Sequence, residues 1–158
     1  MTKPNARFEY RWIMRSGRVI SVELPLGATH TYIFTYDGND NLTDVHGPLS
    51  FHQGYRYDGN NNLEIEINPN GGQIRYGYDA SENLITTTNQ LTFTTIYTYG
   101  LMNELKAFQD AEGRAWGYDH DKLFRVTDIH GPLDTHTHFD YDAIGNITRT
   151  ADAEGHAH

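Results

Sequence analysis

The chain has 158 residues, and 12 lysines and arginines against 21 aspartates and glutamates give it a formal net charge of −9. It contains no cysteine, which excludes disulfides, thiolate metal sites and thiol nucleophiles. Aromatic residues make up 13%, more than a disordered chain carries, and an acidic surface repels nucleic-acid phosphates. No stretch is apolar enough for a membrane-spanning helix or a secretory signal. We therefore expect a folded protein with no nucleic-acid partner and no membrane insertion.

The first part of the chain, residues 1–30, is predicted to be a degenerate first repeat or an edge cap. Ile20, Val22 and Leu24 alternate with other residues at the period of a β-strand, and Gly27 marks a turn after them. Before that strand, residues 7–12 mix arginine and glutamate with aromatic residues. Charges of this kind protect the open edge of a sheet from unwanted pairing.

From residue 31 to residue 158 the sequence is predicted to be a tandem array of six recognisable repeats, the last of them incomplete. Each repeat carries an aromatic-x-Tyr pair, and the second members of the pairs recur at intervals of 21, 21, 21, 19 and 23. Such a period indicates stacked copies of one small structural unit. The pairs are Phe34 and Tyr36, Tyr55 and Tyr57, Tyr76 and Tyr78, Tyr97 and Tyr99, Trp116 and Tyr118, and Phe139 and Tyr141.

After each pair, turn residues and then an aliphatic residue are predicted to build a hairpin. The residue after the tyrosine is Asp37, Asp58, Asp79, Asp119 or Asp142, and Gly100 in the remaining repeat; the aliphatic residues are Leu42, Leu63, Leu84, Leu105, Leu123 and Ile147. An aspartate in this place accepts hydrogen bonds from backbone N–H groups of the loop that follows. Four residues after the tyrosine, Asp40, Asn61, Asn103 and Gly145 tolerate a left-handed backbone, whereas Glu82 does not fit. A second turn per repeat is marked by Gly47, Gly71, Gly113, Gly131 and Gly155, with Asn89 in the repeat that lacks glycine.

These signals predict an all-β fold. Two strands and two turns fit into a unit of about 21 residues, so the chain would hold roughly a dozen strands in one long, curved, twisted antiparallel sheet, an open or partial shell or spiral. One block is copied more closely than the rest, because residues 42–58 and 126–142 are identical at 9 of 17 positions. This duplication favours a structural array over a unique active site.

The repeat resembles the YD repeat of the RHS (rearrangement hotspot) family over residues 31–158. Its consensus, aromatic-x-Tyr-Asp-x-x-Gly-Asn-Leu, is matched most closely by Phe139-Asp-Tyr-Asp-Ala-Ile-Gly-Asn-Ile147. The resemblance implies a sheet coiled into a hollow shell, which in bacterial polymorphic and insecticidal toxins encloses a toxic polypeptide and in teneurins forms adhesion ectodomains. Because about seven repeats cannot wall off a large cavity, and no self-cleavage region or toxin domain is present, the resemblance implies a segment of a larger shell, a remnant, or a small protein completed by association.

Three patterns in the sequence resemble metal-binding or catalytic sites, and each also has a structural explanation. Asp134, His136, His138 and Asp140 have the period-two spacing of a metal-chelating strand face, but they also fit the solvated face opposite Phe139 and Tyr141. Residues 37–41 have the alternating oxygen ligands of a calcium loop but lack its glycine and its bidentate glutamate, so a turn explains them better. Glu64 and Glu66, and Asp110 with Glu112, are carboxylate pairs without a catalytic motif around them. We predict no catalytic, metal-binding or cofactor-binding residues and no enzymatic activity.

The aromatic-x-Tyr pairs leave two functions open. As structural residues they stack across strands and stabilise the sheet. As an exposed aromatic row they would bind glycans or a protein, as other repeat modules do. We favour the structural role: a non-enzymatic scaffold, as in an RHS-type toxin shell, that pairs with itself or with neighbouring repeats through its strand edges and whose partners include a toxin polypeptide or a glycan.

Overall fold

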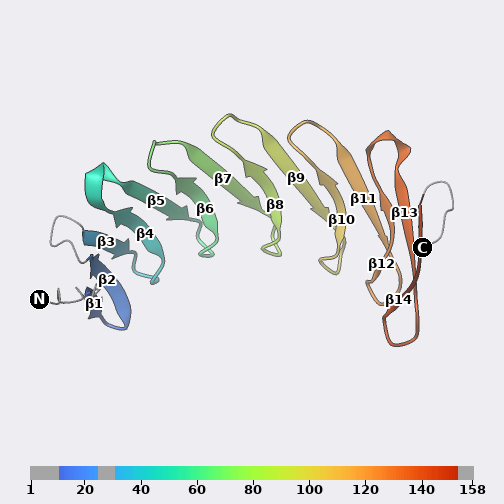
Figure 1. Ribbon diagram of the computed structural model, residues 1–158, viewed down its shortest axis with the longest axis horizontal. Helices are drawn as coiled ribbons and strands as arrows, with labels where there is room; N and C mark the ends of the chain where they lie inside the picture. The colour runs from blue at the N-terminus through green and yellow to red at the C-terminus, as the bar shows by residue number, and fades with distance from the viewer. Residues whose placement is uncertain (1–10, 25–30, 153–158) are drawn as a thin grey trace, which may run out of the picture. The chain divides into compact units, whose positions relative to one another are not determined.

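A computed structural model describes residues 11–24 and 31–152, and the all-β prediction is confirmed (Figure 1). The described residues form fourteen strands, whose order in the sheet is their order along the chain, and all the pairings between them are antiparallel. The strands are β1 (Arg11–Arg15), β2 (Arg18–Glu23), β3 (Thr31–Tyr36), β4 (Leu42–His46), β5 (His52–Tyr57), β6 (Leu63–Ile67), β7 (Gln73–Tyr78), β8 (Leu84–Thr88), β9 (Thr94–Tyr99), β10 (Leu105–Gln109), β11 (Ala115–His120), β12 (Val126–His130), β13 (His136–Tyr141) and β14 (Ile147–Asp152). Two single-turn 3-10 segments, η2 (Pro48–Ser50) and η3 (Pro132–Asp134), join β4 to β5 and β12 to β13.

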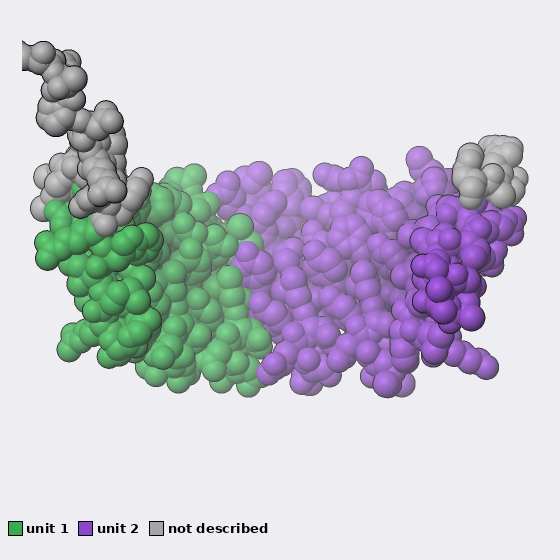
Figure 2. All heavy atoms as spheres, turned by 60° about the horizontal axis from the view of Figure 1, so that its bottom comes forward, with its two compact units in different colours: residues 1–74 green, residues 75–158 purple. Residues whose placement is uncertain are grey.

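The chain divides into two compact units, residues 1–74 and 75–158, which Figure 2 colours separately. Unit 1 contains β1 to β6, unit 2 contains β8 to β14, and the division falls within β7. In each unit the strands form a single layer. None of the helices in residues 11–24 and 31–152 has the length and apolar character needed to cross a bilayer.

Residues 1–30 contribute the hairpin of β1 and β2. Arg15 pairs with Arg18 across a two-residue turn, in which Ser16 (φ 52°) and Gly17 (φ 80°) both have positive φ. This is the two-residue turn whose twist matches that of the flanking strands. Residues 1–10, 25–30 and 153–158, with the predicted edge residues before Arg11 and the predicted turns at Gly27 and Gly155, lie outside the described residues.

The strands pair with the same irregularity in repeat after repeat. The register shifts by one residue beside the last residue of the first strand, at Tyr36, Tyr57, Tyr78, His120 and Tyr141. Each shift is a β-bulge, which bends the bulged strand and increases its right-handed twist. A twist that recurs at the same place every two strands is therefore built into the repeat itself.

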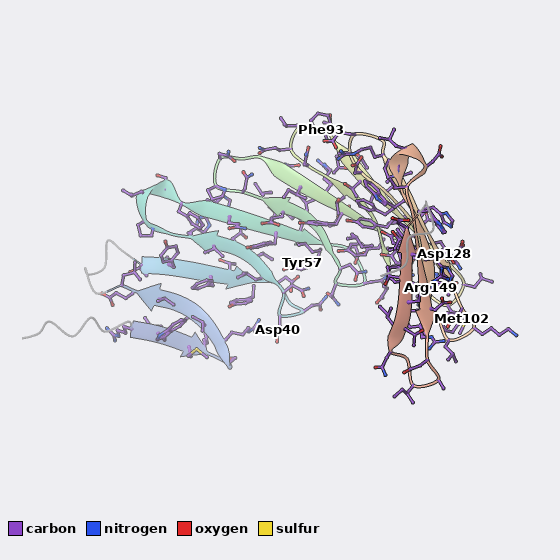
Figure 3. All side chains as sticks on the ribbon, turned by 45° about the vertical axis from the view of Figure 1, so that its right-hand side comes forward. Asp40, Tyr57, Phe93, Met102, Asp128 and Arg149 are labelled. Atoms are coloured by element: carbon purple, nitrogen blue, oxygen red, sulfur yellow. The ribbon has the colours of Figure 1, made fainter. Side chains whose placement is uncertain are left out.

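Neither unit has a closed hydrophobic core. Among the described residues only Val22 and Ala151 are buried apolar residues, and side chains project from both faces of the strands (Figure 3). A single layer has no second layer against which to bury a face. Its stability must come from the backbone ladder and from cross-strand side-chain pairs.

The two faces of the sheet differ in chemistry. In unit 1 Phe34 lies opposite Val45, and in unit 2 Phe108 lies between Tyr97 and Trp116 on the two neighbouring strands, so each of these two groups lies on a single face of its unit. The other face carries Asp44 and His46 opposite Thr35 and Ile33. Aromatic and histidine-rich chemistry are thus on opposite sides of the layer.

Candidate functional site

The loop between β3 and β4 shows how a repeat uses its aspartate. The N–H of Asp37 donates to the carbonyl of Asn41 at 2.9 Å, and the N–H of Asp40 donates back to the carbonyl of Asp37 at 3.3 Å. Oδ1 of Asp37 accepts the N–H groups of Asn39 and Asn41, both at 2.9 Å. These bonds use the carboxylate oxygens that a calcium loop would offer to the ion.

The same loop recurs at both ends of the repeats. Its first residue is Asp58, Asp79, Asp121 or Asp142 in the series that follows β5, β7, β11 and β13, and Asn89 or Asp110 in the series that follows β8 and β10. Asn89 accepts the N–H groups of Leu91 and Phe93, whereas Thr92 has the left-handed backbone at φ 66°. Asn89 therefore takes the place of the aspartate, and the prediction that it replaces a turn glycine is wrong. In the loop that begins at Gly100, the Glu104 carboxylate accepts the Met102 N–H at 3.0 Å instead.

The fourth residue of each loop adopts a left-handed backbone whatever its side chain. In the first series φ runs from 61° at Phe124 to 95° at Gly145, and Glu82 has φ 65°. Asparagine, aspartate and glycine accept this conformation more readily than other residues. Glu82, Thr92 and Phe124 are therefore the positions where the sequence conflicts with the loop that it forms.

The fifth repeat is placed later along the chain than the aromatic-x-Tyr pattern indicates. Its first strand ends at His120, which pairs with Val126 as Tyr36 pairs with Leu42. Asp121 supplies the loop carboxylate, at 2.8 Å from the Leu123 N–H, while Asp119 lies inside β11 opposite Asp128. Leu123 is a loop residue, 69% exposed.

This correction makes the period regular. The first strands of the six repeats end at a constant interval of 21, at Tyr36, Tyr57, Tyr78, Tyr99, His120 and Tyr141. Tyr118 then corresponds to Phe34, and Trp116 corresponds to Tyr32. The fifth repeat was misaligned because Tyr118-Asp119 imitates the Tyr-Asp pair, although only Asp121 is placed to accept the loop N–H groups.

The tyrosine at the strand end holds neighbouring repeats together. The Tyr57 hydroxyl donates to the carbonyl of Leu42 at 3.0 Å, Tyr36 donates to Val19 at 2.9 Å, and Tyr141 donates to Val126 at 2.6 Å. The ladder between β4 and β5 consists of three pairs and ends at Asp44 and Gly54, short of Leu42. The phenol therefore supplies a donor where the backbone ladder stops.

Asparagine side chains add a second connection at the loops. The Asn41 amide donates to the side-chain oxygen of Asn61 at 2.9 Å, and the Asn83 amide makes the same bond to Asn103 at 2.9 Å. Both bonds join the loop of one repeat to the loop of the next. The bonds form where an asparagine that closes one loop faces an asparagine in the fourth position of the next loop.

The first residues of the aromatic-x-Tyr pairs form cross-strand contacts on a half-buried face. The Phe108 ring lies 5.5 Å from that of Tyr97 and 5.1 Å from that of Trp116. At the strand ends, arginine covers tyrosine: the Arg125 guanidinium is 4.5 Å from the centre of the Tyr141 ring. The aromatic residues thus stabilise the sheet and still present part of their surface to solvent.

The predicted metal face is only partly assembled. His136 Nε2 and His138 Nδ1 both contact Oδ1 of Asp128, at 2.9 and 2.8 Å, and His138 Nε2 lies 3.2 Å from Asp140. The two contacts that His138 makes raise the pKa of its imidazole above the ordinary value, and the contact with Asp128 contributes more than the contact with Asp140. Asp134 lies in η3 with φ 57° and does not belong to the strand face.

Sequence reasoning missed Asp128 as the centre of this cluster, and it missed a related group at Asp44, His46 and His52. The signal was present in the duplicated block, which repeats Asp-x-His-Gly-Pro-Leu and, after it, a second histidine. The two predicted carboxylate pairs differ in their surroundings. Glu64 is exposed and Glu66 accepts a hydrogen bond from Gln53 at 2.8 Å, while Asp110 and Glu112 both pair with Arg114.

A family model described as RHS Repeat matches residues 57–92, from the end of β5 to the loop after β8. The resemblance found in the sequence is confirmed over these residues. No curated protein sequence matches the chain at a significant level.

Solved structures share the fold. The crystal structure of TcdB2-TccC3-Cdc42 matches 87% of this chain with a TM-score of 0.69 at 15% sequence identity. The Photorhabdus luminescens Tc holotoxin pore in a TccC3 mutant form matches 87% with a TM-score of 0.57 at 17% identity. TcdB2-TccC3 without its hypervariable C-terminal region matches 89% with a TM-score of 0.58 at 15% identity.

The match is to a small part of these structures. The chain covers 9%, 7% and 7% of the three matched chains, respectively. Its strands therefore have the fold of a short stretch of much longer chains. At the level of the fold, the chain is a structural repeat scaffold.

Proposed function

We propose that the chain is a wall segment of an RHS-type shell that encloses or presents another polypeptide, as the Tc toxin assemblies with the same fold indicate. In this proposal residues 31–158 form the wall and residues 1–30 form a degenerate first repeat or edge cap. The observation that carries the proposal is the use of the repeat signature. The tyrosine hydroxyls and loop aspartates are bonded to the backbone of the array, so they build the sheet and are not held free for a ligand.

The sparse burial supports the same proposal. A sheet in which the described residues include two buried apolar side chains has both faces available for contact. A wall has this property, because one of its faces contacts the contents and its strand edges continue into further repeats. Among the described pairings, β1 pairs only with β2 and β14 only with β13.

Protease protection tests the proposal. The natural protein that carries these repeats would be purified through a terminal affinity tag and treated with proteinase K under native conditions. We expect a polypeptide outside the repeats to survive while the repeats are folded and to be cleaved once they are unfolded. If every segment outside the repeats is cleaved at the rate of an unfolded chain under native conditions, the chain is not the wall of an enclosing shell.

A second candidate function, glycan or protein binding, is favoured by the row of Tyr97, Phe108 and Trp116 across β9, β10 and β11. Ring faces in such a row stack on sugars. Glycan-array binding that is lost in Phe108→Ser and kept in Phe93→Ser, which changes an exposed loop aromatic, would support this function. An array without binding, together with unchanged tryptophan fluorescence, would contradict it.

A further inference from the structure

A group of three metal-ligating side chains lies on the face of the sheet opposite the aromatic residues. Asp44 and His46 come from β4 and His52 from β5, and one ligand atom of each lies within 4.8 Å of the other two. The group lies within unit 1, beside η2. It is separate from the tyrosine and loop contacts that hold the repeats together.

The strand register explains why these side chains meet. His46 and His52 face each other directly in the antiparallel ladder, and their rings stack 4.5 Å apart with 9° between the planes. Asp44 is two residues before His46 and therefore on the same face. Its partner across the ladder is Gly54, which has no side chain to cover the carboxylate, and His52 Nε2 reaches Oδ1 of Asp44 at 3.0 Å.

The ligand set and its spacing suit a small divalent transition metal ion. Zinc binds imidazole nitrogen and carboxylate oxygen at about 2.0–2.2 Å in tetrahedral geometry, so ligand atoms around one ion are about 3.3 Å apart. The three atoms here need to approach by about an ångström or less per side chain, and both His52 (43% exposed) and Asp44 (25%) have room to rotate. Three protein ligands leave a fourth position for water or for a ligand from outside.

We propose that Asp44, His46 and His52 bind a divalent transition metal ion, best matched by Zn²⁺, and that the ion clamps β4 to β5. Imidazole nitrogens dominate the set, which favours zinc, nickel or copper over magnesium or calcium.

The duplicated block provides an internal comparison. Asp128, His130 and His136 are the same three residues in its second copy. There His130 Nε2 contacts Asp119 at 2.9 Å, and His138 Nδ1 contacts Oδ1 of Asp128 at 2.8 Å. The corresponding residues in the first block are Thr35 and Gly54, which carry neither a carboxylate nor an imidazole. In the first block the ligand atoms therefore lie close to one another, whereas in the second they are also held by Asp119 and His138.

Calorimetry with ZnCl₂ on the full chain, freed of metal by a chelator, tests the proposal. The test variant is His46→Ala/His52→Gln, and the matched control is His130→Ala/His136→Gln. We expect the wild type to bind Zn²⁺ and the test variant to lose one site per chain, while the control keeps that site. Equal stoichiometry and affinity in the wild type and the test variant, or no zinc binding by the wild type, would overturn the proposal.

A second measurement needs no variant and remains valid if the substitutions disturb folding. Diethyl pyrocarbonate modifies accessible neutral imidazoles, and peptide mass spectrometry reports the modification of each histidine in the wild type. Zn²⁺ should protect His46 and His52 much more than His156 and His158, which are not part of the proposed site. Uniform protection of all histidines, or no protection at either His46 or His52, would refute the assignment.

Discussion

Tyr57→Phe removes one hydroxyl group and leaves the aromatic ring in place. In the structure this hydroxyl donates at 3.0 Å to the carbonyl of Leu42, beyond the point where the β4–β5 ladder ends. A hydrogen bond of this kind contributes about 0.5–1.5 kcal/mol net, because the unfolded state exchanges it for water. Leu42 is half-buried, so water replaces the lost donor only in part. We expect a loss of about 1 kcal/mol, or a fall in Tm of roughly 2–4 °C for a chain of this size.

The matched control is Tyr55→Phe on the same strand. Phe34 and Phe139 occupy the equivalent position in two other repeats, so a hydroxyl is not required there. Both variants would be compared by urea unfolding followed by circular dichroism, with the same dependence on urea expected for both. Their apolar surfaces are almost identical, and a difference between them therefore reports the hydrogen bond.

Hydrogen exchange gives a local measure of the same bond. Peptides covering residues 42–57 should exchange about fivefold faster in Tyr57→Phe, since about 1 kcal/mol of local opening corresponds to that factor. Peptides covering residues 126–141, where Tyr141 makes the equivalent bond to Val126, serve as the internal reference and should not change. Equal stability of Tyr57→Phe and Tyr55→Phe, with no local change in exchange, would refute a structural role for the strand-end hydroxyl.

Three further predictions concern the loops and the edges. Phe124→Asn should stabilise the chain by about 0.5–1 kcal/mol, because asparagine accepts the left-handed backbone more readily. The control Leu123→Asn, at the exposed neighbouring position, should not stabilise it. Equal effects of the two substitutions in urea unfolding would argue against backbone strain at Phe124. The hydrogen bond from the Asn83 side chain, with those from the N–H groups of Asn83 and Ser81, holds the pKa of Asp79 below its ordinary value. The stability from this aspartate is therefore fully present above the unfolded pKa of about 3.9 and is lost as pH falls through the lower folded value. Asp79→Asn should keep the loop, as Asn89 does naturally, and reduce the fall in urea midpoint between pH 5 and pH 2; an unchanged pH profile would show that Asp79 does not contribute. Light scattering coupled to gel filtration should detect species larger than 18.0 kDa that grow with concentration, since β1 and β14 each have one edge without a described partner strand; a single 18.0 kDa species throughout would exclude self-association through these edges.

The described residues form no closed core, so individual hydrogen bonds matter more to the stability of the sheet. In a globular domain, tens of buried side chains share the work of stabilisation, whereas here the described residues include only two buried apolar ones. Loop bonds, strand-end tyrosines and cross-strand rings recur from one repeat to the next instead. A substitution in one repeat should therefore destabilise mainly that repeat and its neighbours. Other linear arrays behave in this way, because their stability is a sum of the stabilities of the repeats and of the interfaces between neighbouring repeats.

Much of the fold was predictable because the same local sequence pattern recurs in six repeats. Alternating residues predicted strands, and Asp or Asn after a strand predicted a loop held by its own side chain, as at Asp37 and Asp58. The fifth repeat was misread because Tyr118-Asp119 imitates the signature. The duplicated block already pairs Leu42 with Val126, which gives the register that the structure shows.

The sequence alone determined the class of fold, the average period of 21 residues and most of the residues that build the loops, because these depend on contacts between residues close in the chain; the fifth repeat and Asn89 were the exceptions. Only the tertiary structure decided which strand neighbour each side chain meets. It placed the Tyr57 hydroxyl on the carbonyl of Leu42, and it brought Asp44, His46 and His52 within reach of one ion. Such contacts depend on strand register, and a one-residue bulge in each repeat changes which side chains share a face.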